Sequence, residues 1–227
     1  MEDKIISRVF FVRHGASVYK EYFCNEKELD LIPKGEKQIK RTAKNLEEVI
    51  DRNLPILIVS SPRIRTMNSA VIIKEYLESK EVKIISEKIF LRRFFEAIRF
   101  KGPILEGTSR IKTGYKDWLE GSYKDSMSMI ESPEKFIRRV KHSFKNSVKL
   151  LRRYKKPEQI ILVSHGEIMD GLLLTGFHFF KKYNKENTPR YGEIVEIQIF
   201  PKKVVILFRN KEYVLDETKI KLNPLIK

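Results

Sequence analysis

Short apolar runs alternate along this chain with longer segments in which apolar residues recur every three or four positions. The runs predict buried strands, and the periodic segments predict helices that each bury one face. Strands are predicted at 5–12, 55–60, 82–86 and 159–164, with a final pair of edge strands at 194–200 and 204–209. Helices are predicted at 34–51, 65–79 and 133–156, and a further helix begins at Gly166.

Apolar strands that alternate with helices are typical of a largely parallel sheet covered by helices on both faces. We therefore predict the α/β class, as a three-layer α/β/α sandwich with a mostly parallel central sheet and an antiparallel edge strand. No solenoid-length repeat and no low-complexity linker divides the chain, so residues 1–227 are expected to form a single domain. Residues 97–131 mix glycines with aromatic and charged residues, and we expect this irregular insertion to be a lid.

Composition narrows the class of protein but not its function. The 227 residues are 41% hydrophobic and 33% charged, as in globular proteins rather than disordered ones. No apolar run reaches the roughly 18 residues of a membrane span, and the acidic start of the chain does not look like a secretory signal. Because Cys24 is the single cysteine, no internal disulfide is possible, and we expect a cytoplasmic location.

Two segments of the chain echo each other and carry half of its four histidines. Each is an apolar strand that ends in His-Gly, with His14 in one segment and His165 in the other. Ligands of such sheets bind beyond the carboxyl ends of the strands, so we expect both imidazoles at one edge of the sheet. The predicted strand 55–60 leads through Arg63 and Arg65 into a helix and brings guanidinium groups to that edge.

Histidines and arginines at one edge make an anion site that suits a phosphoryl group. Planar guanidinium groups bind phosphate oxygens in pairs, and a helix start adds backbone N–H donors. The net charge of +16 would draw anions toward such a site, although solvated surface lysines would give the same total. A neutral imidazole whose far nitrogen donates to a fixed acceptor is a competent nucleophile, and a carboxylic acid must then protonate the departing oxygen.

Five segments, in order along the chain, resemble the signature segments of the histidine phosphatase (phosphoglycerate mutase-like) superfamily. They are Arg13-His14-Gly15 after an apolar strand, the helix start 31–38, the segment 61–70, Glu131-Ser132-Pro133 with Phe136 and Arg139-Val140, and Val163-Ser164-His165-Gly166. A lone His-Gly pair means little, whereas five matches in order are specific. The resemblance covers nearly the whole chain and implies the phosphoglycerate mutase-like form of the predicted sandwich.

The resemblance also implies a role for each matched residue. His14 attacks phosphorus and becomes phosphohistidine, while Arg13, Arg65 and His165 hold the phosphoryl oxygens. Ser17, just after the signature, keeps a hydroxyl able to donate to phosphate. Water then hydrolyses the phosphohistidine, so the family's chemistry implies neither a metal ion nor a cofactor.

The general acid is the part of the site where the chain departs from the family. Arg93 stands where the family has a glutamate after the third strand. Glu96, three residues further on, is the nearest carboxylate and our choice, with Glu87 as the fallback and Glu106 in the predicted lid as a third choice. Arg63 stands at a leucine position of the family, and we interpret it as a solvated residue or one behind the site rather than a phosphate ligand.

The motifs favour a metal-independent phosphomonoester hydrolase of the histidine acid type, acting on a small phosphorylated metabolite or a phosphorylated side chain. One alternative is a mutase that uses 2,3-bisphosphoglycerate, but this chain has Ala16 and Lys20 where the mutases have glutamate and asparagine. Another is a non-catalytic polyanion-binding protein of the same fold. The chain has no nucleic-acid motif, we expect no membrane partner, and the oligomeric state stays open.

Overall fold

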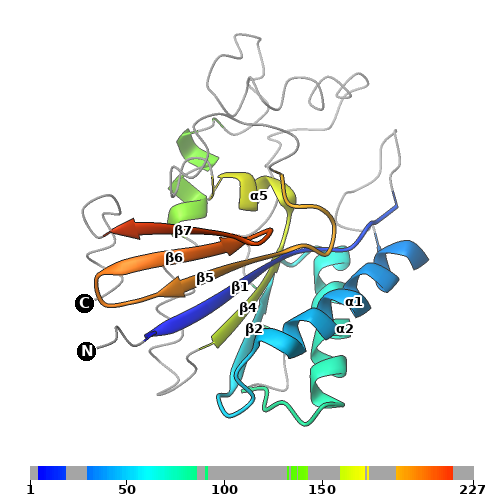
Figure 1. Ribbon diagram of the computed structural model, residues 1–227. Helices are drawn as coiled ribbons and strands as arrows, with labels where there is room; N and C mark the ends of the chain where they lie inside the picture. The colour runs from blue at the N-terminus through cyan, green and yellow to red at the C-terminus, as the bar shows by residue number, and fades with distance from the viewer. Residues whose placement is uncertain are drawn as a thin grey trace.

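A seven-stranded sheet runs through the molecule in the order β3-β2-β4-β1-β5-β6-β7 (Figure 1). In the computed structural model the strands are β1 (Ser7–Arg13), β2 (Ile56–Ser60), β3 (Phe90–Leu91), β4 (Gln159–Ser164), β5 (Ile194–Ile199), β6 (Lys203–Phe208) and β7 (Lys211–Asp216). The helices are α1 (Pro33–Val49), α2 (Ile64–Glu78) and α5 (Gly166–Gly171), and residues 134–136 and 138–142 are also helical. The structure describes residues 5–18, 30–85, 90–91, 132, 134–136, 138–142, 159–171, 173 and 188–216.

The sheet has two halves that differ in strand direction. In the parallel half, β3, β2, β4 and β1 are parallel neighbours. In the antiparallel half, β5, β6 and β7 follow β1 as successive antiparallel neighbours. The predicted α/β class, with a mostly parallel core and an antiparallel edge, is therefore confirmed, and the antiparallel edge is three strands wide.

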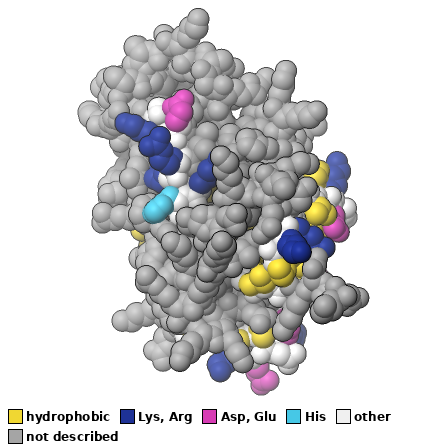
Figure 2. Space-filling view, turned by 90° about the vertical axis from the view of Figure 1, so that its left-hand side faces the viewer, with side chains coloured by type: hydrophobic (Ala, Val, Ile, Leu, Met, Phe, Trp, Pro, Cys, Tyr) yellow, Lys and Arg dark blue, Asp and Glu magenta, His cyan; other side chains and the backbone are white. Residues whose placement is uncertain are grey.

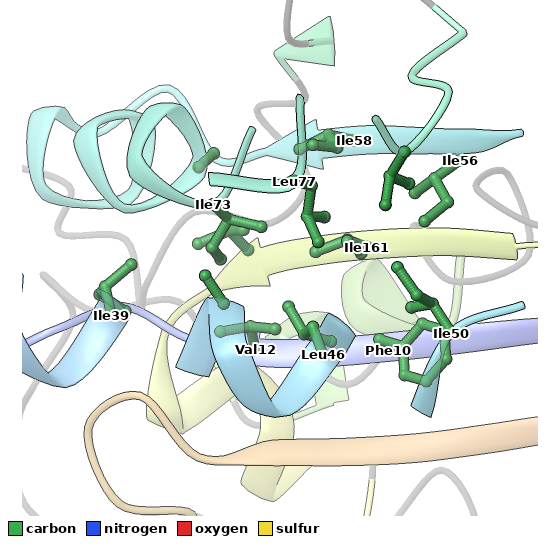
Figure 3. Close-up of a cluster of buried hydrophobic side chains, with 14 residues drawn as sticks. Phe10, Val12, Ile39, Leu46, Ile50, Ile56, Ile58, Ile73, Leu77 and Ile161 are labelled. Carbon is green, nitrogen blue, oxygen red and sulfur yellow. The ribbon is translucent and has the colours of Figure 1, made fainter. Parts of the chain in front are cut away.

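Helices cover both faces of the sheet because the strands are apolar on both sides. In β1, Phe10 and Val12 are fully buried in the cluster that packs against α1 and α2 (Figure 3). Val9 and Phe11, which alternate with them, are as deeply buried on the opposite face. On that side lie α5 and the helical residues 134–136 and 138–142 (Figure 1), giving the three layers that the apolar runs predicted.

The two helices that were predicted most clearly, α1 and α2, form because their apolar residues recur at helical spacing. In α1, Ile39, Ala43 and Leu46 are fully buried and belong to the cluster drawn in Figure 3. Pro33 stands in the first turn, where its missing N–H has no helical partner to lose. Within the predicted helix 133–156, the described part is helical at 134–136 and 138–142, and Phe136 and Val140 are buried as expected.

The prediction of a third strand at 82–86 is wrong. Ile84 makes only an isolated parallel bridge with Ile56, and the strand beside β2 is β3, where Phe90 pairs with Val59. The two pairings differ in register, because β2 advances three residues between them while the neighbouring segment advances six. An edge strand is paired on one side only, which is why its apolar run did not determine its register.

The predicted final pair of edge strands is present as β5 and β6. A third strand, β7, was not predicted, and it follows β6 after a turn at Arg209-Asn210. Both turn residues have positive φ angles, 50° and 58°, as a two-residue hairpin of the primed type requires. Arginine rarely adopts this conformation, so the sequence carried a weak signal for the turn. The predicted lid at 97–131 lies outside the described residues. Among those described, no helix has the length and apolarity needed to cross a membrane.

Candidate phosphoryl-transfer site

The two histidines of the repeated His-Gly pattern lie side by side because their strands are parallel neighbours. Arg13 at the end of β1 pairs in register with Ser164 at the end of β4, so His14 and His165 leave the sheet together. The backbone N–H of His14 donates to the Ser164 carbonyl at 2.9 Å. The ring centroids are 5.1 Å apart with an interplanar angle of 69°. The predicted meeting of the two imidazoles is thus what the structure contains.

The His14 ring has a defined tautomer. Its Nδ1 lies 2.7 Å from the Gly15 carbonyl oxygen, which can only accept, so Nδ1 carries the proton and donates. Its Nε2 therefore holds a lone pair, and this lone pair accepts from Arg65 Nε at 3.3 Å. Burial, followed by the nearby Arg65 guanidinium, lowers the pKa of His14 from 6.5 to about 3. The ring is a neutral base with one nitrogen available for chemistry.

Arg65 reaches both histidines from the first turn of α2. Besides its bond to His14, its Nη2 lies 3.5 Å from His165 Nδ1. Arg65 is 7% exposed, so its charge acts at short range in a site that water reaches little. β2 and β4 are parallel neighbours, and the helix that follows β2 therefore begins beside His165. A guanidinium group centred on two imidazoles is an anion-binding arrangement.

His165 is more deeply buried than His14 and is held from behind by Ser61. The serine Oγ lies 3.0 Å from His165 Nε2, and the side chain of His165 is 1% exposed. Because Nδ1 faces an Arg65 donor, the neutral tautomer with its proton on Nε2 satisfies both contacts, with Nε2 donating to the serine. Burial, then His14 and the arginines, lower the pKa of His165 well below 6.5.

Arg13 lies beside the two rings and is held by a loop from the antiparallel half. Its Nη1 donates to the Pro189 carbonyl at 2.6 Å, and its guanidinium carbon stands 4.1 Å from the centroid of the Tyr191 ring. On another side it lies against Gly166, where an added Cβ would be 2.8 Å from the guanidinium carbon. The charge of Arg13 contributes to the low pKa of both histidines.

The loop that carries His14 is fixed by the motif residues of α1 and α2. Gln38 Oε1 accepts from the Ala16 N–H at 2.9 Å, and Ser69 Oγ accepts from the Gly15 N–H at 3.2 Å. Gly35, in the first turn of α1, lies so close to Ala16 that an added Cβ would be 1.9 Å from its carbonyl oxygen. The segments 31–38 and 61–70 thus serve the site by holding its backbone.

Ser17, Arg63 and the proposed acids do not join this cluster in the same way. Ser17 forms a backbone bridge with Leu31, and within the described residues its hydroxyl contacts none of the histidines or arginines of the site. Arg63, at the N-cap of α2, is half-buried and lowers the pKa of His165, and its Nε has no partner among the described residues. Arg63 therefore lies close enough to the site for its charge to act on His165.

The three candidate general acids, Glu87, Glu96 and Glu106, lie outside the described residues. Within the described part of the chain, the groups that contact the rings of His14 and His165 include no carboxylate. Also within that part, no group of three or more His, Cys, Asp or Glu side chains is placed to hold a metal ion.

Sequence reasoning missed three contacts of the site. Ser61 had been matched to a motif without a role, and neither Pro189 nor Tyr191 had been considered. Tyr191 lies 5.5 Å from His14, centroid to centroid, and is 42% exposed. The only signal for the loop is a Pro and a Gly before a predicted strand, which indicates a turn but not its neighbours.

Comparison with known proteins gives a family and a set of folds. The family model of the histidine phosphatase superfamily (branch 1) matches residues 9–211, which is most of the chain. No curated protein matches the chain in sequence.

Among solved structures, the chain resembles a phosphoglycerate mutase from Bacillus anthracis str. Sterne, with a TM-score of 0.66 and 15% identity over 94% of this chain and 93% of the other. It also resembles a mycobacterial glucosyl-3-phosphoglycerate phosphatase, with a TM-score of 0.61 and 16% identity over 85% and 90%. A phosphoserine phosphatase mutant from Entamoeba histolytica, in complex with phosphoserine, gives a TM-score of 0.54 and 18% identity over 92% and 95%. At these identities the likeness is one of fold.

Proposed function

The chain belongs to the histidine phosphatase superfamily, and from this membership we propose that it is a phosphomonoester hydrolase working through a phosphohistidine on His14. The observation that carries the proposal is the environment of the His14 ring. Its Nδ1–H is held by the Gly15 carbonyl, and its Nε2 lone pair faces Arg65. An imidazole with one nitrogen fixed as a donor and the other neutral and facing a cation is prepared to attack an anionic phosphoryl group.

In the first step, Nε2 of His14 forms a bond to phosphorus while the bond between phosphorus and the ester oxygen breaks. The electron pair of that bond leaves on the oxygen, which takes a proton from the general acid. The positive charge that develops on the imidazole is shared with Nδ1, where the Gly15 carbonyl accepts its N–H at 2.7 Å. The Gly15 carbonyl thus stabilises the phosphorylated ring as well as orienting the free one.

In the second step, water attacks the phosphohistidine. The bond between Nε2 and phosphorus breaks, its electron pair returns to the ring, and inorganic phosphate leaves. The proton of the attacking water goes to the carboxylate that acted as the acid, which resets the site. This scheme uses no metal ion and no cofactor.

In this proposal Arg13, Arg65 and His165 hold the phosphoryl oxygens. The neutral His165 of the free site donates its one N–H to Ser61, so it can donate to a phosphoryl oxygen only after Nδ1 takes up a proton, which the negative charge of the bound group favours. Arg65 Nε, which donates to His14 Nε2, meets the phosphoryl oxygens as soon as phosphorus approaches that nitrogen. Planar guanidinium groups suit this task because each offers paired N–H donors to phosphate oxygens. Ser17 is kept as a further donor, on the sequence pattern alone.

We assign the general acid to Glu96. The strand β3 ends at Leu91 beside Ser60, at the same end of the sheet as His165. Glu96 follows this strand by five positions, whereas Glu87 precedes it. Residues that follow a parallel strand leave it at the edge where ligands bind, which favours Glu96 over Glu87. Glu106 stays the third choice.

The substrate is proposed to be a small phosphorylated metabolite or a phosphorylated side chain. Two of the similar structures are phosphatases of glucosyl-3-phosphoglycerate and phosphoserine. A mutase is the second candidate, because the phosphoglycerate mutase has a TM-score of 0.66 and a mutase would share the phosphohistidine step. The two differ in whether water or a second substrate accepts the phosphoryl group.

A non-catalytic polyanion-binding protein is the third candidate, on the net charge of +16. In Figure 2, however, the described Lys and Arg side chains of one face lie in separate groups, and acidic side chains lie beside some of these groups. Binding through many phosphate contacts would fall steeply with salt, by about 0.9 log units per contact for each tenfold rise in salt. Hydrolysis of a small substrate would respond far less.

The test is hydrolysis of p-nitrophenyl phosphate in excess EDTA, across pH 5 to 8, with purified wild type and variants. We expect metal-independent turnover that falls by at least about 10³-fold in His14→Ala and Arg65→Ala. His142→Ala and Arg41→Ala are matched controls, since both side chains are exposed and stand on other helices. Glu96→Gln should lower turnover of alkyl phosphates more than that of p-nitrophenyl phosphate, whose leaving group needs less protonation.

Three outcomes would contradict parts of the proposal. Turnover that survives His14→Ala would remove the phosphohistidine mechanism. Transfer from 2,3-bisphosphoglycerate to phosphoglycerate at a rate above hydrolysis would identify a mutase. No turnover with several phosphate esters, together with steeply salt-dependent binding of polyanions, would favour the third candidate.

A further inference from the structure

Tyr191 occupies the exposed side of the site and has no role in the mechanism above. Its ring centroid is 5.5 Å from that of His14, with the two planes tilted by 52°. A second neighbour is Arg13, whose guanidinium carbon lies 4.1 Å from the ring centroid. Tyr191 is 42% exposed whereas His14 is 6% exposed, so this contact of the nucleophile reaches the protein surface.

The loop that presents this ring is tied down at both ends. Arg209 donates to the carboxylate of Glu193 through Nε at 2.6 Å and Nη2 at 2.8 Å, and to the Thr188 carbonyl at 3.0 Å. The Gly192 N–H donates to the Arg13 carbonyl at 3.0 Å, and Gly192 has a φ of 74°, which favours glycine. These hydrogen bonds fix the position of the loop, and with it the position of the Tyr191 ring.

A phosphate ester bound for attack must direct its leaving group away from His14, because the attacking and departing atoms lie roughly in line with phosphorus. The two histidines and Arg65 are buried, so the leaving group extends toward the exposed side of the site. Tyr191 is the aromatic residue on that side among those described. One part of its ring is occupied by Arg13, and the exposed part is available to a flat group.

We propose that Tyr191 is a specificity-determining residue whose ring stacks on the leaving group, so that the site selects phosphate esters carrying a planar unsaturated ring. This inference rests on the proposed function, because it takes the phosphoryl group to lie at Nε2 of His14. It adds the chemical class of the leaving group: an aryl or heteroaryl ring is bound better than a saturated group of the same size. Stacking of aromatic rings in offset or edge-to-face geometry supplies the preference.

Tyr191 also supports Arg13, and this second effect must be separated from the first. Loss of the contact with Arg13 weakens the grip on the phosphoryl group and lowers binding of every phosphate or phosphonate alike. Loss of stacking lowers binding only of ligands with an aromatic ring. The ratio of affinities for two ligands that share one phosphonate group therefore reports the stacking alone.

The experiment measures dissociation constants of phenylphosphonate and cyclohexylphosphonate by calorimetry, with wild type, Tyr191→Phe and Tyr191→Leu. We expect wild type to bind phenylphosphonate about 3- to 10-fold more tightly than cyclohexylphosphonate. Tyr191→Phe keeps the ring and should keep this ratio, whereas Tyr191→Leu should bring it close to one. The dissociation constant of inorganic phosphate is measured for the same three proteins. It reports how much each variant weakens phosphate binding through the lost contact with Arg13.

Phosphonates are not hydrolysed, so this test does not depend on turnover. Equal affinity of wild type for the two phosphonates, absence of binding by both, or an unchanged ratio in Tyr191→Leu would each overturn the inference. A lost preference in Tyr191→Leu in a protein without phosphatase activity would support the stacking while the proposed function fails. If wild type hydrolyses p-nitrophenyl phosphate but binds the two phosphonates equally, the proposed function stands and the stacking inference is wrong.

Discussion

The parallel and antiparallel halves of the sheet meet at β1, and both reach the same site. The parallel half supplies the two imidazoles and the buried guanidinium group. His14 and His165 follow the neighbouring strands β1 and β4, and Arg65 lies in the first turn of the helix that follows β2. The antiparallel half supplies Pro189 and Tyr191, which hold the side chain of Arg13. The histidines and Arg65 thus come from strand ends in register, while the orientation of Arg13 depends on a loop that returns from far along the chain.

The burial of the two histidines makes the parallel half sensitive to acid, and this is the largest effect we expect. The pKa of His14 is about 3 in the folded protein and near 6.5 in the unfolded chain, so between these values the unfolded chain binds one more proton. The free energy of unfolding should therefore fall by about 1.4 kcal/mol for each pH unit as pH falls below 6.5, and His165 adds in the same direction.

Urea unfolding followed by circular dichroism between pH 7 and pH 4 measures this slope. His14→Asn should make the slope shallower, whatever it does to stability at pH 7, because the variant lacks the titrating group. His142→Asn, the same change at an exposed histidine far from the site in sequence, is the matched control. An identical slope in wild type and His14→Asn would mean that acid sensitivity arises elsewhere.

A second prediction separates activity from stability within α5. Gly166→Ala would place a methyl group 2.8 Å from the guanidinium carbon of Arg13, a flexible end that can move aside. We expect kcat/KM for p-nitrophenyl phosphate to fall about 100-fold, with little change in Tm, because Arg13 is displaced while the fold is kept.

Gly171→Ala is the matched change in the same helix. Its methyl group would stand 2.7 Å from the ring of Phe136 rather than beside Arg13. It should lower stability by about 1–3 kcal/mol, as overpacking of a core does, and leave kcat/KM nearly unchanged. If Gly166→Ala instead lowered stability and left kcat/KM unchanged, a methyl group at this position would not displace Arg13 from its active position.

The third prediction removes the contacts by which Arg209 fixes the loop 188–193, which leads into the antiparallel half. Arg209→Ala loses the pair with Glu193 and the bond to the Thr188 carbonyl, so Pro189 and Tyr191 hold Arg13 less firmly. We expect kcat/KM to fall about 3- to 10-fold, a modest effect because the pair is partly exposed. Arg190→Ala, whose exposed side chain lies on the same loop, is the control. Equal kinetics of wild type and Arg209→Ala would limit the antiparallel half to a structural role.

The smallest effect concerns the hydrogen bond behind His165. Ser61→Ala removes the partner of His165 Nε2, which lies at 3.0 Å, and leaves a buried ring nitrogen unpaired. One hydrogen bond of this kind corresponds to about 0.5–1.5 kcal/mol, so kcat/KM should fall about 2- to 10-fold. Ser79→Ala, at the exposed end of α2, should have no effect. An unchanged kcat/KM in Ser61→Ala would show that packing alone orients His165.

Much of the parallel half could be predicted, since its signals are local. The helical spacing in α1 and α2 and the apolar runs of β1, β2 and β4 all led to elements found within a few residues of their predicted bounds. The edges were harder. β3 and β7 are paired on one side only, and the turn before β7 uses Arg209 in a conformation that arginine rarely adopts.

By itself the sequence determined that His14, His165 and Arg65 would gather at one edge, because parallel strands end together and each residue stands next to a strand end or helix start. Only the tertiary structure decided what holds these groups. Ser61 and His165 are 104 positions apart, and Arg13 and Pro189 are 176 apart. Such contacts depend on how whole elements pack, and no local periodicity encodes them, so the reactive groups could be predicted while the contacts that orient them could not.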